Sequence, residues 1–436
     1  MTRLERVSMG EATPIGGNAH VVDRTTFELW ESEVRTYCRS FPDIFERARG
    51  AWLETVDGRR ILDLLSGAGS LNYGHNDPAI MAAVFAYILK GGIINSLDLH
   101  TAEKASFIEA FTRLVLTPRN LRYKFQFPGP TGTNAVEAAF KIARRKTGRK
   151  NIAAFHRGFH GMTLGSLAAT TNPGARSFSG VPLEHVVFWP YDGDEEQQAG
   201  SVRLIAERLE ALRDEDKPAA AVLEIVQGEG GLRCASPEWL ENLAALLKQH
   251  GVLLIVDDIQ AGCGRTGAFF SFEESGIVPD LVVLSKSLSG FGTPFALVLM
   301  DPELDVWAPG AHNGTFRGNN LAFVGARAAL ENYWLDDAFA RQVRDKAGYL
   351  QDRLAAVAAA MPGLALRGRG LMRGIEFESG EIAANFSRNL YQQGIMAETC
   401  GPQARTLKLL PALTITADDL SQACDGLERS ARELSR

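Results

Sequence analysis

The chain has 436 residues, 22% of which are charged, and its formal net charge is −6 at pH 7. This length allows a large buried core, arranged as one large domain with one or two smaller lobes. The charge balance gives no indication of a nucleic-acid partner or of binding to an anionic membrane surface.

The cysteines and the apolar runs argue against several other classes. The five cysteines are odd in number and widely scattered, with no Cys-x-x-Cys pair, so neither a disulfide framework nor a zinc site is expected. No apolar run approaches the ~18 residues that a membrane span needs. Residues 1–22 also lack the continuous apolar stretch of a secretory signal. We therefore expect a soluble cytoplasmic protein with no metal site and no membrane partner.

The N-terminal part of the chain is rich in turn signals. Residues 1–24 mix Gly, Thr, Pro and charged residues without periodicity, which predicts a mobile extension. An Asp-Gly pair between two apolar-rich runs predicts a β-hairpin over 51–63. Helices are then expected over 78–90 and 102–116.

The middle of the chain alternates short apolar runs with longer helical patterns, which predicts a mostly parallel, doubly wound α/β sheet. The predicted strands are 123–127, 151–155, 186–189, 220–226, 253–257, 281–284 and 296–300, and the predicted helices between them include 134–146, 201–213 and 237–250. Helical periodicity then continues from 321 to 361, and a strand is expected over 368–377.

Two of the core strands end close to a charged residue. The run VLLIV at 252–256 is followed by Asp257, and the run LVVL at 281–284 leads to Lys286. Open α/β sheets bind their ligands at the carboxyl ends of strands. An amine there can act as a Schiff-base nucleophile, and a carboxylate can keep a pyridinium nitrogen protonated. The pair therefore indicates pyridoxal-phosphate chemistry, although a helix cap and a solvated lysine would explain the two residues separately.

Two further motifs could bind such a cofactor. The turn GPTGTN at 129–134 follows a strand and opens a helix, so its backbone N–H groups and small residues could bind a phosphate, with Thr133 adding a hydroxyl. An ordinary N-capped turn would have the same sequence. The pair Phe159 and His160 follows the next strand, and an aromatic ring there could stack on a cofactor ring.

Acidic and polar residues mark two other turns. Glu224 and Glu229 lie near one strand end beside a Gly-rich turn, and two acids at one strand end are less ordinary than a single capping residue. The run GTFRGNN at 314–320 is a polar loop before a helix. It could provide a second phosphate contact, or it could be only a turn.

Taken together and in this order, these motifs resemble the class III (ω-type) aminotransferases of pyridoxal-phosphate fold type I, over nearly the whole chain from about residue 25. The resemblance implies an α/β fold with a mostly parallel seven-stranded sheet flanked by helices in a large cofactor-binding domain, 78–330. It also implies a small α+β domain built from both termini, 25–77 and 331–436.

The resemblance also implies roles for individual residues. Lys286 would form the Schiff base with pyridoxal phosphate and move the proton, and Asp257 would pair with the pyridine N–H of the cofactor. Gln260 would lie near the hydroxyl of the cofactor ring, and Phe159 would stack on this ring. The cofactor-binding residues that it implies in full are Gly132, Thr133, Asn134, Phe159, His160, Glu224, Asp257, Gln260, Lys286 and Thr315. The phosphate would be held by the first three of these, joined by Thr315 from the second subunit of a homodimer.

Longer phrases narrow the resemblance to one group. The runs ESEVRTYCRSFP (31–42), LNYGHN (71–76), VDDIQAGCGRTG (256–267) and HNGTFRGNN (312–320) are similar to the diaminobutyrate–2-oxoglutarate aminotransferases of the ectoine pathway. This implies amino transfer from L-glutamate to L-aspartate 4-semialdehyde. An ornithine or acetylornithine aminotransferase, an aminomutase and a non-catalytic relative are the alternatives, and the pathway stays open between ectoine, siderophores and peptide antibiotics.

Two positions depart from the ornithine and γ-aminobutyrate branches. Met162 stands where those branches carry an arginine that helps to select the substrate. Lys408 stands where they carry the arginine that holds the α-carboxylate of glutamate, gated by an acid that corresponds to Glu229. We predict Glu229 and Lys408 as substrate-binding residues. The way in which the carboxylate is held stays open, because a lysine lacks the two-pronged guanidinium.

Overall fold

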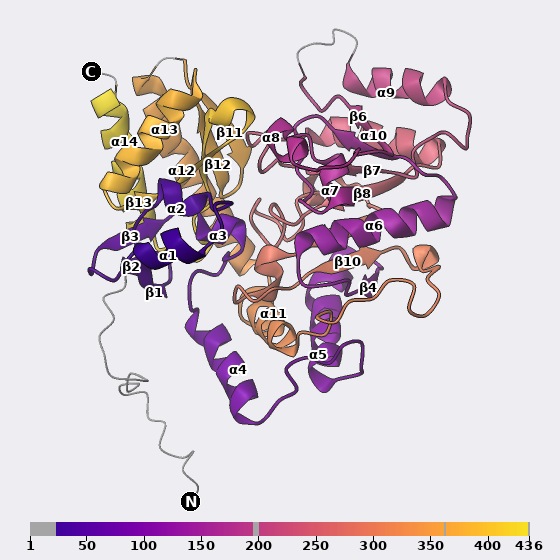
Figure 1. Ribbon diagram of the computed structural model, residues 1–436, viewed down its shortest axis with the longest axis horizontal. Helices are drawn as coiled ribbons and strands as arrows, with labels where there is room; N and C mark the ends of the chain where they lie inside the picture. The colour runs from indigo at the N-terminus through magenta and orange to yellow at the C-terminus, as the bar shows by residue number, and fades with distance from the viewer. Residues whose placement is uncertain (1–22, 195–199, 362, 435–436) are drawn as a thin grey trace, which may run out of the picture.

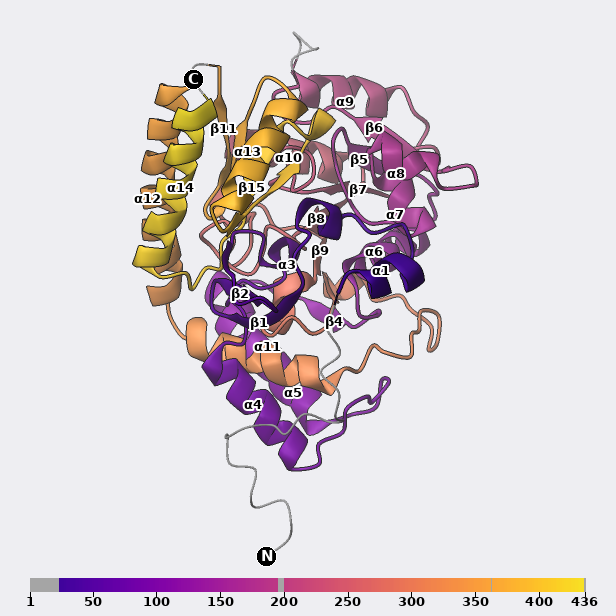
Figure 2. The same cartoon turned by 60° about the vertical axis from the view of Figure 1, so that its left-hand side comes forward.

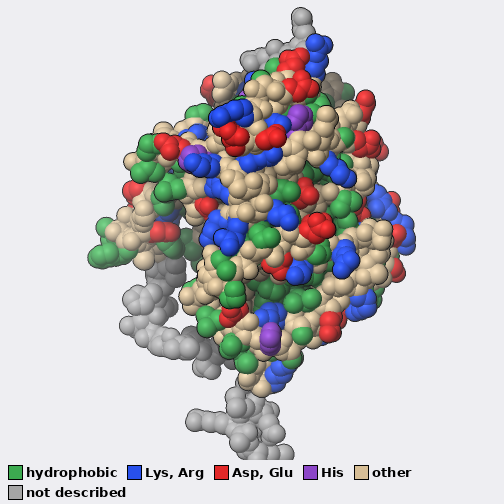
Figure 3. Space-filling view, turned by 90° about the vertical axis from the view of Figure 1, so that its right-hand side faces the viewer, with side chains coloured by type: hydrophobic (Ala, Val, Ile, Leu, Met, Phe, Trp, Pro, Cys, Tyr) green, Lys and Arg blue, Asp and Glu red, His purple; other side chains and the backbone are tan. Residues whose placement is uncertain are grey.

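The computed structural model describes residues 23–194, 200–361 and 363–434. Nearly all of the extension predicted over 1–24 lies outside these residues. Among the helices within them, none combines the length and the apolar character that crossing a bilayer requires. Acidic and basic side chains are interspersed over the face drawn in Figure 3, with no large area of one sign.

A seven-stranded sheet forms the centre of the molecule, with the strand order β4-β10-β9-β8-β7-β5-β6. Only β10 runs antiparallel to its neighbours, so the predicted mostly parallel sheet is confirmed. The strands are β4 (Lys124–Gln126), β5 (Ile152–Phe155), β6 (Val186–Trp189), β7 (Ala220–Leu223), β8 (Leu253–Asp257), β9 (Leu281–Leu284) and β10 (Leu297–Met300).

Helices cover both faces of this sheet, as a parallel sheet requires. Side chains of the central strands alternate between two hydrophobic clusters, one with α6 (Gly132–Thr147) and one with α10 (Pro237–Gln249) (Figure 1). The other helices along this part of the chain are α4 (Pro78–Leu89), α5 (Ala102–Phe111), α7 (Leu164–Ala169), α8 (Pro173–Ser177), α9 (Ser201–Glu210) and α11 (Asn320–Tyr333).

The smaller part of the molecule joins the two ends of the chain. The predicted hairpin is present as β2 (Trp52–Thr55) and β3 (Arg60–Asp63), and β3 pairs in parallel with β13 (Ile395–Met396) from the C-terminal region. Figures 1 and 2 both show the indigo N-terminal strands beside the yellow C-terminal elements. The predicted small domain from both termini is therefore present, while its boundaries at 77 and 330 stay predictions.

A second small sheet lies next to it, with the order β11-β12-β15-β14 and antiparallel pairing throughout. The remaining elements are α1 (Thr25–Trp30), α2 (Tyr37–Ser40), β1 (Phe45–Arg49), α3 (Ser66–Gly69), α12 (Ala338–Ala360), β11 (Ala365–Arg369), β12 (Met372–Glu376), α13 (Gly380–Gln392), β14 (Glu398–Cys400), β15 (Thr406–Leu409) and α14 (Ala417–Leu434).

One predicted strand is wrong, and one predicted helical region is interrupted. The single strand expected over 368–377 is a hairpin of β11 and β12, which turns at Gly370. This glycine has a φ of 63°, and a Cβ on it would lie 2.5 Å from the backbone carbon of Thr266. The helical periodicity predicted from 321 to 361 corresponds to two helices, α11 and α12, and in the break between them the Asp336 carboxylate accepts from the Ala338 N–H at 2.7 Å.

Smaller differences concern the ends of elements. The strand expected over 220–226 ends at Leu223, and the next residues turn toward the site described below. The helix expected over 102–116 ends at Phe111, and a π-helical turn continues it over Thr112–Leu116.

Arg265 connects three segments of the fold and has no exposed surface. Its guanidinium donates hydrogen bonds to the Asn72 side-chain oxygen at 2.6 Å, to the Leu371 carbonyl oxygen at 3.1 Å and to the carbonyl oxygen of Pro411. These acceptors come from the N-terminal and C-terminal regions. A buried charge needs such hydrogen bonds; here they satisfy both terminal nitrogens, while the Nε has no partner among the described residues, and they hold the two parts of the molecule together.

Replacing Arg265 with Met would leave these buried oxygens without their donor. We expect the free energy of unfolding to fall by about 3 kcal/mol or more, measured by urea denaturation. The matched control is Arg213→Met, because the Arg213 side chain is 74% exposed and makes only surface ion pairs. Equal stabilities of the two variants would contradict this view of Arg265.

Candidate active site

Three neighbouring strands deliver charged residues to one edge of the large sheet. Glu224 directly follows β7, and Asp257 is the last residue of β8. Lys286 is the second residue after β9. Because β7, β8 and β9 pair in parallel, their carboxyl ends lie side by side. A cavity of about 170 Å³ opens at this edge. It is lined by Gly132, Thr133, Phe159, His160, Gly161, Glu224, Glu229, Asp257, Ile259, Gln260 and Lys286.

Three residues predicted for the site do not line this cavity. The Asn134 carboxamide oxygen accepts from the Thr131 N–H at 3.2 Å and from its hydroxyl at 2.8 Å, so this side chain caps α6. Thr315 is exposed in a loop before α11. Lys408 is completely buried and contacts Glu229 rather than the cavity.

Asp257 and His160 form a buried pair. One Asp257 carboxylate oxygen accepts from His160 Nδ1 at 2.7 Å, and the other accepts from the Ile259 N–H at 3.2 Å. Burial alone would lower the pKa of His160, but the hydrogen bond and the charge of Asp257, together with the charge of Glu224, raise it above the usual 6.5. These two hydrogen bonds fix the direction of the Asp257 carboxylate.

Glu224 connects two loops of the site. Its carboxylate accepts from the Phe159 N–H at 2.9 Å and from the Gly228 N–H at 3.0 Å. Burial raises the pKa of Glu224 to about 7, and the charge of Asp257 acts in the same direction. This carboxyl therefore holds the loop with Phe159 against the loop that carries Glu229.

Lys286 reaches toward the carbonyl oxygen of Ala68, to which its Nζ donates at 2.9 Å. The same carbonyl accepts from the Gln260 amide at 3.0 Å. Burial lowers the pKa of the Lys286 amine below its usual range, and the positive charge of Lys408 acts in the same direction. A lysine that loses its proton more readily is better suited to act as a nucleophile and base.

The start of α6 forms a cradle for an anion. The Thr133 hydroxyl lies 2.6 Å from the hydroxyls of both Thr163 and Ser166, beside the backbone N–H groups of the first helical turn. Gly161 keeps this cradle open, because a Cβ on it would lie 2.5 Å from the Thr133 hydroxyl oxygen. Its φ of 132° also favours glycine.

The side chains that line the cavity fit a flat, phosphorylated, cationic ring such as pyridoxal phosphate. It combines a carboxylate (Asp257), an amine (Lys286), an aromatic ring (Phe159) and the hydroxyl-lined cradle. The Gln260 amide oxygen is enclosed and has no hydrogen-bond partner among the residues that the structure describes. A bound group with a donor would satisfy it.

Sequence reasoning missed three contributors to the site. Ile259 and Gly161 line the cavity, and the carbonyl of Ala68 orients both Lys286 and Gln260. The only sequence signal for Ile259 and Gly161 was their position beside residues already singled out. Nothing in the local sequence marks the Ala68 carbonyl, because a backbone oxygen carries no residue type.

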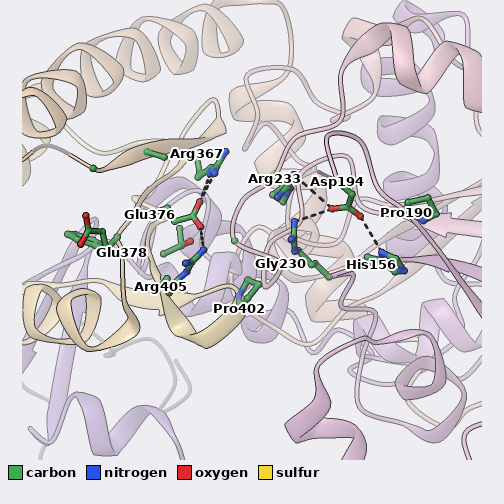
Figure 4. A pocket seen from close by; sticks show the side chains of 16 residues that line it. His156, Pro190, Asp194, Gly230, Arg233, Arg367, Glu376, Glu378, Pro402 and Arg405 are labelled. Atoms are coloured by element: carbon green, nitrogen blue, oxygen red, sulfur yellow. Dashed lines mark hydrogen bonds and ion pairs between the residues drawn. The ribbon is translucent and has the colours of Figure 1, made fainter. Parts of the chain in front are cut away.

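A larger cavity, of about 610 Å³, lies beside the catalytic one between the large and small parts of the molecule (Figure 4). Two ion-paired groups face each other across it, one around Asp194 and one around Glu376. Gly230 and Gly231 line this cavity, whereas their neighbour Glu229 lines the catalytic cavity. The two cavities are therefore separated by one short loop.

Comparison with known families agrees with this geometry. The family model described as aminotransferase class-III matches residues 37–430. The chain is a class III aminotransferase. It is 50% identical over 419 residues to a diaminobutyrate--2-oxoglutarate transaminase of Bordetella parapertussis. The match covers 94% of this chain and 96% of that protein. An enzyme of the same name from Nocardia farcinica is 50% identical over 401 residues and covers 92% of each chain.

Solved structures support the fold of this aminotransferase. An ornithine aminotransferase from Toxoplasma gondii, whose structure is described with partial occupancy of PLP at its active site, has a TM-score of 0.83 at 24% identity. The match covers 94% of this chain and 93% of that chain. An S-selective transaminase from Arthrobacter sp. has a TM-score of 0.82 at 21% identity, over 95% and 98% of the two chains. The predicted fold type is thus confirmed.

The raised pKa of His160 predicts a pH-dependent contribution to stability. Because the pKa of His160 is higher in the native state than in the unfolded state, this residue stabilises the fold below about pH 6.5. The stabilisation is lost as the pH rises through the native pKa. The variant His160→Gln should therefore lower the thermal unfolding midpoint more at about pH 6 than at about pH 9. The exposed His100, replaced in the same way, is the control. A deficit of the same size at both pH values would contradict the assignment.

Proposed function

We propose that this aminotransferase uses pyridoxal phosphate to transfer the amino group of L-glutamate to L-aspartate 4-semialdehyde. The products are L-2,4-diaminobutyrate and 2-oxoglutarate. The observation that carries the proposal is the placement of Lys286 and Asp257 at adjacent strand ends of one cavity, next to the cradle at Thr133. The names of the relatives at 50% identity support the choice of substrates.

The residues around the cavity suggest how the cofactor would be held. Asp257, oriented by His160, would accept a hydrogen bond from the ring N–H and keep that nitrogen protonated. The first turn of α6 and the Thr133 hydroxyl would bind the phosphate. Phe159 would stack on the ring, and Gln260 would face the ring hydroxyl. When bound, pyridoxal phosphate supplies the electron sink that stabilises negative charge on the substrate carbon.

Lys286 would carry out the proton movement. Its Nζ lines the cavity and its lowered pKa favours the unprotonated amine, so it can take a proton from the substrate carbon and return it to the cofactor side. Glutamate gives its amino group in the first half-reaction and leaves as 2-oxoglutarate. The semialdehyde takes the amino group in the second half-reaction, so ping-pong kinetics are expected.

We also propose a cytoplasmic homodimer. Thr315 is exposed in its own chain and does not line its own cavity, which suits a residue that completes the phosphate site of a second subunit. The described cysteines are all free, which suits a reducing compartment. The product would serve a diaminobutyrate-consuming route of the ectoine type.

Replacing Lys286 with Ala should abolish turnover, because no other described amine lines the catalytic cavity. We expect kcat to fall by about 10⁴-fold or more, together with a changed visible absorption band of the purified holoenzyme. Lys90→Ala, which removes a lysine with a 59% exposed side chain, should leave kcat unchanged. Near-normal turnover of the Lys286 variant would overturn the proposal.

A panel of substrates tests the reaction itself. We expect the holoenzyme to turn over fastest with L-glutamate as donor and L-aspartate 4-semialdehyde as acceptor, each half-reaction being followed by its absorbance change. A higher rate with ornithine or acetylornithine would instead identify the corresponding ω-aminotransferase. Turnover of a single amino acid without any external donor would identify an aminomutase.

A further inference from the structure

Lys408 lies between two carboxylates rather than one. Its Nζ is 2.6 Å from a Glu229 oxygen and 2.9 Å from a Glu398 oxygen. Glu398 on β14 and Lys408 on β15 are direct partners in the antiparallel ladder, so the register of the sheet fixes this contact. Glu229 arrives separately, from the loop after β7.

This arrangement leaves the group of three with a net negative charge. One ammonium is shared by two carboxylates, and the exposed fractions of the side chains are 0% for Lys408, 12% for Glu398 and 36% for Glu229. A substrate that enters the cavity therefore meets the carboxylate of Glu229, with Lys408 and Glu398 behind it and outside the cavity lining. If Glu229 turned away, Lys408 would still be neutralised by Glu398.

Further groups near this end of the cavity can accept hydrogen bonds or favour a positive charge. The amide oxygen of Gln260, a residue only 8% exposed that lines the cavity, lacks a hydrogen-bond partner within the described part of the chain. The hydroxyl of Tyr37 is close enough to be affected by the same acids: burial raises its pKa to about 12, and the charges of Glu398 and Glu229 add to the shift. An ion with several N–H donors would satisfy these groups.

The same two carboxylates act on the catalytic lysine. The charges of Glu229 and Glu398 favour the protonated form of Lys286 and so oppose the lowering of its pKa by burial and by Lys408. Glu229 and Lys286 also line the same cavity, so the acid pair adjoins the amine expected to react.

We propose that Glu229 binds the second ammonium group of the substrate, and that Glu398 is a specificity-determining residue because it neutralises Lys408 and leaves the Glu229 carboxylate negative toward the cavity. This inference rests on the proposed function. In that reaction, the group recognised is the α-ammonium of the semialdehyde and of 2,4-diaminobutyrate, while the distal carbon reacts near Lys286. Aldehydes and amines of the same length without an α-ammonium are poor substrates because they leave the acid pair without a cation.

Pairs of amines that differ only in the α-ammonium test this inference. One pair is 2,4-diaminobutyrate and 4-aminobutyrate, and a second is ornithine and 5-aminovalerate. For each amine, the cofactor half-reaction of the holoenzyme gives kcat/KM from the absorbance change. The variant is Glu398→Gln, which keeps the shape of the side chain and removes its charge.

We expect the wild-type enzyme to favour the diamine of at least one pair. In the Glu398→Gln variant, this preference should fall by about 10- to 100-fold, with the loss mainly in KM for the diamine. The kcat/KM for glutamate should stay the same or rise, because Lys408 then has one negative partner fewer. The control Glu376→Gln removes another ion-paired carboxylate of the small domain, which pairs with Arg367 and Arg405 instead of Lys408, and should leave the preference unchanged.

The possible outcomes separate the inference from the proposed function. Three outcomes overturn the inference. The Glu398 variant keeps the wild-type preference, or it loses kcat/KM equally for glutamate and the diamine, or the wild-type enzyme shows no preference in either pair. If 2,4-diaminobutyrate is not a substrate but the preference for ornithine over 5-aminovalerate depends on Glu398, the inference holds and the proposed function is wrong.

Discussion

The parallel pairing of β7, β8 and β9 is the constraint on which the site depends. The register places Leu223 beside Val256 and Asp257 beside Val283, so the residues that follow these strands come together at one edge. A shift of one residue in either pairing would turn the side chains of a whole strand to the opposite face. The pairing of the buried strands therefore fixes where the candidate site residues lie. This is why Glu224, Asp257 and Lys286 can be far apart in sequence and still share a cavity.

The charges gathered at this edge are stable because each has a counterpart. Asp257 has His160, Glu224 accepts two backbone N–H groups, and Lys408 has two carboxylates. Burial of an ion without such partners would be strongly unfavourable. Lys286 is different: among the described residues its amine bonds the Ala68 carbonyl and no carboxylate, and burial lowers its pKa. The amine expected to react is thus the one whose charge is least stabilised, which is what a nucleophile and base requires.

Much of the fold and of the site could be predicted from the sequence. The strands β6, β8 and β9 have the predicted bounds, because short runs of β-branched and apolar residues between turns are strong local signals. The hairpin of β11 and β12 was missed, since its turn at Gly370 depends on a close approach to Thr266 from a distant segment. The partnership of Lys408 with Glu398 was missed for the same reason. It depends on the register between β14 and β15, and the spacing of the two residues along the chain does not reveal it.

The central claim is that Lys286 is the residue that binds the cofactor covalently, opposite Asp257 in the cavity at the sheet edge. Borohydride reduction of the purified holoenzyme, followed by proteolysis and mass spectrometry, tests this directly, because reduction fixes the cofactor to the lysine that holds it. We expect one modified peptide, with the added pyridoxyl mass on Lys286. A modification on any other lysine, or none in an enzyme that is active and carries the cofactor, would contradict it.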